Sequence, residues 1–75
     1  MSRPQPDRQS VLDVLSDSDG QLADVEKELV AEVRDLSRLA DPPGAVLCRL
    51  NMLRATVHAC RLMLGEARDE ADRWR

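Results

Sequence analysis

This sequence has few aromatic and bulky β-branched side chains from which to build a core. It contains no Phe, Tyr or Ile and a single Trp, whereas Leu, Ala and Val together supply 26 of its 75 residues. Leu and Ala are strong helix formers, and the missing residue types are those enriched in strands. A chain this short buries only about 60% of the surface that its unfolded form exposes. The composition therefore predicts one small all-α domain and excludes a large enclosed active site.

Lysine is almost absent as well, and the basic residues form no cluster. Ten of the eleven basic residues are Arg, a bias that together with the missing Ile is typical of a GC-rich bacterial or phage genome. With no basic patch and no second aromatic ring for base stacking, direct nucleic-acid binding is disfavoured. The polar start, MSRPQP, lacks the apolar stretch of a secretory signal, which predicts a cytoplasmic chain with reduced thiols. Three arginines within residues 45–64 argue against a membrane span.

Two long segments with helical periodicity follow a proline-containing start. Residues 1–9 are predicted to be a disordered or extended tail, and residues 10–75 a single helical-hairpin domain. Within that domain we expect a short helix over 10–16 capped by Ser10, a first long helix over 20–40, a turn over 41–44 and a second long helix over 45–74. Asp41, before two prolines, is placed to cap the second long helix. The Ser and Asp residues before Gly20 favour a kink, although a continuous helix over 10–40 stays open.

The apolar residues of the two long helices predict an antiparallel hairpin. They recur in steps of three and four, which marks one face of a helix. Facing pairs such as Leu22 with Leu64 and Leu36 with Leu50 keep a nearly constant sum of residue numbers, as antiparallel neighbours must. The predicted hairpin core is Leu22, Val25, Leu29, Val33, Leu36, Val46, Leu50, Leu53, Val57, Cys60 and Leu64.

The second long helix carries a further apolar stripe on its other side. A helix that is apolar on two sides is normally buried on two sides, and the first long helix covers only one. We therefore expect a second copy of the chain to cover the stripe, giving a four-helix bundle with the second helices inside; a groove for a different protein is the alternative. The predicted interface is Cys48, Met52, Ala55, Ala59 and Leu62, with Trp74 at its edge.

No motif of catalysis or metal binding is complete. Asp17, Asp19, Gly20 and Glu26 resemble part of a calcium loop, but Leu15 stands where its first acidic ligand belongs. His58 with Cys60 is the only close His/Cys pair and lacks the further ligands of a zinc site. The arginines of the second helix are expected on its flanks, with no inward carboxylate on the first helix to face them. We therefore predict no catalytic residues, no cofactor and no metal.

These observations predict a small non-enzymatic protein–protein interaction module, such as an adaptor, regulator or assembly subunit. Its partner is expected to be a second copy of the chain, another protein, or both. The alternative is an acidic inhibitor or decoy that blocks a basic or nucleic-acid-binding surface of its target, because residues 11–44 carry nine acidic and three basic side chains. Binding by such a decoy should weaken steeply with salt, whereas association through an apolar face should not.

Overall fold

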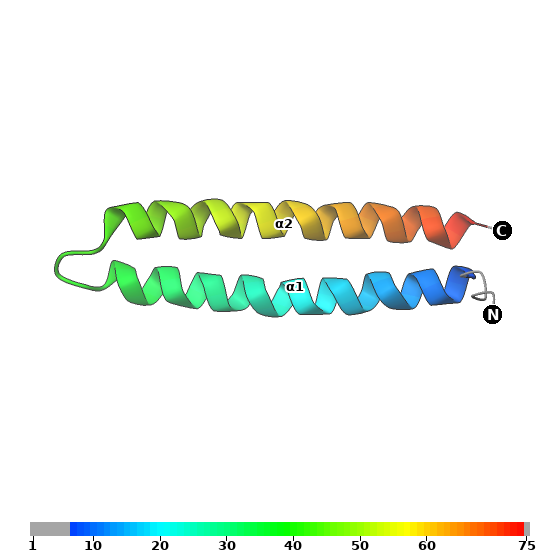
Figure 1. The fold of residues 1–75 in the computed structure, drawn as a ribbon, viewed down its shortest axis with the longest axis horizontal. Helices are drawn as coiled ribbons and strands as arrows, with labels where there is room; N and C mark the ends of the chain where they lie inside the picture. Colours follow the sequence, from blue (N-terminus) through cyan, green and yellow to red (C-terminus); the bar gives the residue numbers. More distant parts are fainter. Residues whose placement is uncertain (1–6, 75) are drawn as a thin grey trace, which may run out of the picture.

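The chain folds into two long antiparallel helices joined by one short loop. A computed structural model describes residues 7–74, in which α1 spans Arg8–Ser37 and α2 spans Gly44–Arg73. Figure 1 shows the helices side by side, with the start of α1 and the end of α2 at the same end of the hairpin. The predicted all-helical hairpin is thereby confirmed. The first six residues of the predicted tail, 1–6, lie outside the described residues.

Helix α1 begins earlier than predicted and has no break. Asp7 caps it, accepting a hydrogen bond at Oδ1 from the backbone N–H of Ser10 over 2.7 Å, so Ser10 is inside the first turn. The run that ends at Gly20 is helical throughout, and no separate short helix over 10–16 is present. Asp19 turns its carboxylate toward α2 rather than capping a new helix. Packing across the hairpin thus overrides the local preference of these residues.

The loop between the helices also differs from the expected turn. Helix α1 ends at Ser37 rather than at residue 40, and the N–H groups of Arg38 and Leu39 donate to the carbonyls of Asp35 and Leu36. Helix α2 begins at Gly44 with Pro43 at its N-cap, and no side chain caps it. Proline lacks an N–H, so it fits an end at which the amide groups have no helical partner.

The helices meet along a seven-residue repeat that is rotated from the predicted stripe on α2. In α1 the least exposed positions include all four leucines at seven-residue spacing: Leu15, Leu22, Leu29 and Leu36. In α2 the corresponding positions are Leu47, Leu50, Val57, Arg61, Leu64 and Ala71. Four predicted core residues are instead exposed in the single chain: Val25, Val46, Leu53 and Cys60. In this rotation Arg61 contacts acidic side chains of α1. The spacing of apolar residues gives no information about such a charge contact.

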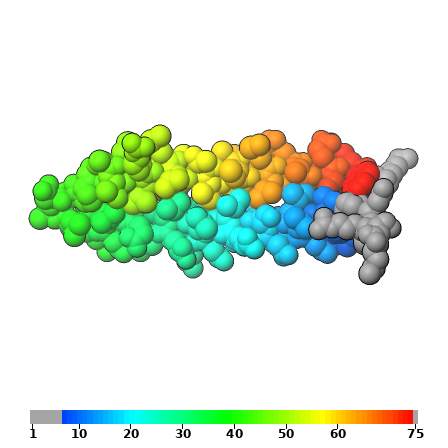
Figure 2. Space-filling model, in the orientation of Figure 1, coloured from blue at the N-terminus to red at the C-terminus, as the bar shows by residue number. Residues whose placement is uncertain are grey.

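A two-helix hairpin leaves almost every residue in contact with water. Ala71, at 8% exposure, is the only buried residue among those that the structure describes. The body measures 57 × 28 × 15 Å and is therefore a thin slab. Figure 2 shows the long outline of one broad face of this slab. Each helix is therefore covered along only one side.

Candidate association surface

The slab has two broad faces of different chemistry, and the charged one carries a three-residue ion cluster. Arg61 of α2 donates from Nε to Asp19 Oδ1 over 3.0 Å and from Nη1 to Glu26 Oε1 over 3.3 Å. Asp19 and Glu26 lie seven residues apart, two turns along α1, so one guanidinium spans both. The Arg61 and Glu26 side chains are 33% and 23% exposed. The cluster therefore lies where α1 and α2 meet, and it forms one charged layer between otherwise apolar contacts.

The electrostatics of this cluster favour the charged form of Arg61. The hydrogen bond to Asp19 and the charges of Asp19 and Glu26 raise the pKa of Arg61 above its ordinary value, against a smaller opposing effect of desolvation. Glu26 Oε2 is buried without a hydrogen bond, and His58 Nδ1 lies 3.5 Å from it.

The expectation that the arginines lie only on flanks, with no inward carboxylate on the first helix, is wrong for Arg61. The sequence did contain a signal for this contact: an arginine on the second helix, Arg61, and two residues of opposite charge seven apart on the first, Asp19 and Glu26.

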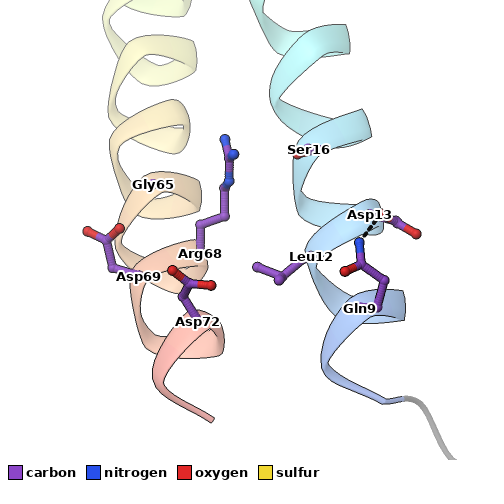
Figure 3. A pocket seen from close by; sticks show the side chains of 8 residues that line it. All are labelled: Gln9, Leu12, Asp13, Ser16, Gly65, Arg68, Asp69 and Asp72. Atoms are coloured by element: carbon purple, nitrogen blue, oxygen red, sulfur yellow. Dashed lines mark hydrogen bonds between the residues drawn. The ribbon is translucent and has the colours of Figure 1, made fainter.

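The open end of the hairpin has a hollow of about 390 Å³ on the same side. In Figure 3, Leu12 points from α1 toward α2, Arg68 rises between the helices, and Gln9 donates to Asp13 over 2.8 Å. The lining is completed by Ser16, Gly65, Asp69 and Asp72. Its acidic residues are exposed to solvent. The hollow is therefore open to solvent and lined mainly by polar and acidic side chains.

The opposite face is apolar. A shallow trough of about 420 Å³ runs between the helices there, lined by Ser18, Leu22, Cys60, Met63, Leu64 and Ala67. Residues seven apart share one side of paired helices, so Val11 and Val25 extend the trough on α1, and Val46 and Leu53 extend it on α2. Trp74, seven residues after Ala67, continues this line just beyond the end of α2 and is exposed. We call this surface, interrupted on α1 by Glu32, the apolar face.

The stripe predicted as an interface lies elsewhere on α2. Cys48, Met52, Ala55, Ala59 and Leu62 are all exposed, and we call them the outer stripe. Cys48, Met52 and Ala59 lie on the side of α2 away from α1, about half a turn from the contact position Leu50. Ala55 and Leu62 border the charged face, where each lines a hollow together with α1 residues. Trp74 is aligned with the apolar face and does not join the outer stripe. Sequence reasoning also did not single out Met63, whose exposed side chain lines the trough.

The described part of the chain was also searched for metal sites and for membrane-spanning helices. Within residues 7–74, no group of three or more His, Cys, Asp or Glu side chains is arranged to hold a metal ion. Neither described helix contains a segment long and apolar enough to span a membrane. Comparisons with protein-family models, curated proteins and solved structures give no match to this chain.

Proposed function

We propose that this chain is a small, non-enzymatic protein–protein interaction module that associates through exposed apolar surface of α2. The observation that carries the proposal is the near absence of buried residues: of residues 7–74, only Ala71 is buried. Stable domains of this size place a set of large apolar side chains out of contact with water. Here Met52, Leu53, Leu62 and Met63 remain exposed on one helix.

The dimensions of the hairpin support the same proposal. Its radius of gyration is 17.3 Å, whereas a compact domain of 75 residues has about 11 Å. Its accessible surface is 6239 Å², and a folded monomer of 8.4 kDa exposes about 4,600 Å². The chain thus exposes about 1,600 Å² more than a compact monomer of its mass, and its exposed apolar side chains can gain free energy by removal from water.

The arrangement of polar groups is consistent with a binding role. Arg61, Asp19 and Glu26 neutralise one another across the helix contact, and so they act on the hairpin itself. Charged layers of this kind select one pairing of helices over others. The cluster thus holds α2 in the orientation that leaves its apolar side chains on the surface.

Sedimentation equilibrium together with thermal unfolding tests the proposal. If association completes the core, the molecular mass should exceed the 8.4 kDa of one chain, and Tm should rise with protein concentration. A chain that stays at 8.4 kDa and unfolds cooperatively at a Tm independent of concentration would contradict the proposal, because such a hairpin needs no partner.

A further inference from the structure

We infer that a second copy of this chain covers the apolar face, with each α1 lying on the partner's α2 and with both loops at the same end of a four-helix bundle. This inference rests on the proposed function and deepens it, because it names the partner, the surface and the orientation. The outer stripe then stays on the outside of the dimer.

The apolar face offers more surface than the outer stripe. Both helices contribute to it, and the trough exposes the edges of Leu22 and Leu64 between them. The outer stripe belongs to one helix and includes the small side chains of Ala55 and Ala59. Packing through the outer stripe would form a row of four helices and leave the trough wet. Packing through the apolar face surrounds the leucine columns with four helices, which is the arrangement of a bundle core.

The available area fits this occupant. A stable interface removes about 800 Å² from each partner, and obligate homodimers remove more than about 1,000 Å² from each. The hairpin exposes about 1,600 Å² more than a compact monomer of its mass, which exceeds the area that an obligate homodimer removes from each chain. A hairpin 57 Å long offers a partner of equal length contact along the whole trough.

Charge selects the relative orientation of the two copies. Helix α1 has eight acidic and three basic residues, whereas α2 has four acidic and five basic residues. Placing α1 on the partner's α1 would bring two acidic helices together. Placing α1 on the partner's α2 pairs a helix of net charge −5 with one of net charge +1, which avoids the repulsion between two acidic helices. A two-fold axis parallel to the helices produces this pairing and keeps both loops at one end.

The edges of the apolar face match in this orientation. On α1, Glu28 and Asp35 lie on the edge beside the trough, about 14 and 3 Å from the loop end of the helix. On α2, Arg49 lies on the edge that also carries Met63, about 7 Å from the loop end. Arg49 of one copy thus meets Glu28 and Asp35 of the other. Toward the open end, Met63 is about 28 Å from the loop end, between the levels of Gln21 at about 24 Å and Val14 at about 34 Å on the same edge of α1.

Two exposed leucines on α2 provide a matched test of the surface. Leu53 is on the apolar face and is 52% exposed, and Leu62 is on the outer stripe and is 59% exposed. Leu53→Glu should raise the dimer dissociation constant by about 100-fold or more, because it buries a carboxylate without a partner. Leu62→Glu should change it by less than about threefold, as expected for a solvated site. Circular dichroism checks that both variants keep their helix content at the concentrations used.

Spin labels near the loop test the orientation. Ala40→Cys, in a chain that also carries Cys48→Ser and Cys60→Ala, places a single label on the exposed loop. Loops at one end predict a label separation within a dimer of less than about 35 Å, whereas loops at opposite ends predict more than about 45 Å, the length of a 30-residue helix. The parent dimer must persist in the labelled chain by sedimentation.

The outcomes separate this inference from the proposed function. Greater sensitivity to Leu62→Glu than to Leu53→Glu, or labels more than about 45 Å apart, overturns the inference and leaves an interaction module standing. A chain that is monomeric and folds cooperatively without any dependence on concentration overturns both. A chain that is monomeric alone and gains its stability only with a different protein overturns the inference alone.

Discussion

At the scale of single residues, the run before Gly20 shows how a contact across the hairpin decides local structure. Asp19 belongs to a class of residues that favours helix caps, yet it lies inside α1 and accepts from Arg61. Gly20 also stays helical, and its φ is not positive. Neither residue was predictable as helix interior from its own type, because the stabilising partner is on the other helix.

Gly20 provides a direct test of this interpretation. A Cβ added at Gly20 would meet no other atom within 4 Å, so the helix does not require glycine there. Gly20→Ala should therefore raise the free energy of unfolding by about 0.5–1 kcal/mol through the lower entropy of the unfolded chain. Urea unfolding at a fixed protein concentration measures the change. A loss of stability would show that the helix is not continuous through Gly20; Gly65→Ala, at an equally open position, is the control.

Arg61 is expected to matter more than its neighbours in the same heptad column. Arg61→Ala leaves the carboxylate of Glu26, which is 23% exposed, without its guanidinium partner and should lower Tm by a few degrees. Arg54→Ala removes an exposed arginine from the equivalent position one heptad earlier and should lower Tm less. Melting curves at low and high salt measure the difference, which should shrink as salt screens the cluster. Equal effects of the two substitutions would contradict a specific role for the cluster.

At the scale of elements, the sequence predicted the number, order and pairing of the long helices but not their rotation. Periodic leucines and the two prolines were sufficient for the antiparallel hairpin, because helix period and chain reversal are local properties. The side of α2 that meets α1 was not accessible in this way. A stripe that includes Val46, Leu53 and Cys60 lies beside one that includes Leu47 and Arg61, and apolar spacing alone favours the wrong one. The ion cluster and the leucines of α1 together decide between them.

The outer stripe and the apolar face illustrate the same limit for the candidate site. A surplus of apolar side chains on α2 was predictable by counting, and it indicated an association surface. The location of the trough depends on the helix rotation, so Met63 could be placed on it only from the structure. Trp74 then follows from its seven-residue spacing to Ala67.

The start of α1 yields a prediction at this scale. Asp7→Ala removes the side chain that accepts from the N–H of Ser10 and should cost about 1 kcal/mol of the free energy of unfolding. Ser10→Ala, which the sequence alone would have made the damaging change, should cost only a few tenths of a kcal/mol, because Ser10 contributes its backbone amide and not its hydroxyl. Urea unfolding compares the two variants. A larger loss at Ser10 than at Asp7 would place the cap at the later residue.

At the scale of the whole molecule, the hairpin has almost no buried core because it is long and thin. One hairpin is a slab 15 Å thick with an apolar and a charged broad face. Such a slab reaches the compactness of a globular domain when its apolar face is covered by another layer of helices, since layers pack about 10 Å apart. The acidic helix α1 then keeps its outer side in water, which favours solubility of the assembly.

Small-angle X-ray scattering distinguishes the ways in which two slabs can meet. Stacking through the apolar face should leave the longest dimension near the 57 Å of one hairpin while the cross-section becomes nearly square, because only the 15 Å dimension grows. Contact through the outer stripes would instead widen the 28 Å dimension and give a flat particle, and contact end to end would roughly double the length. The scattering should change little between low and high salt, because apolar burial holds the stacked dimer together. Dissociation by salt would instead favour an acidic surface that binds through charge.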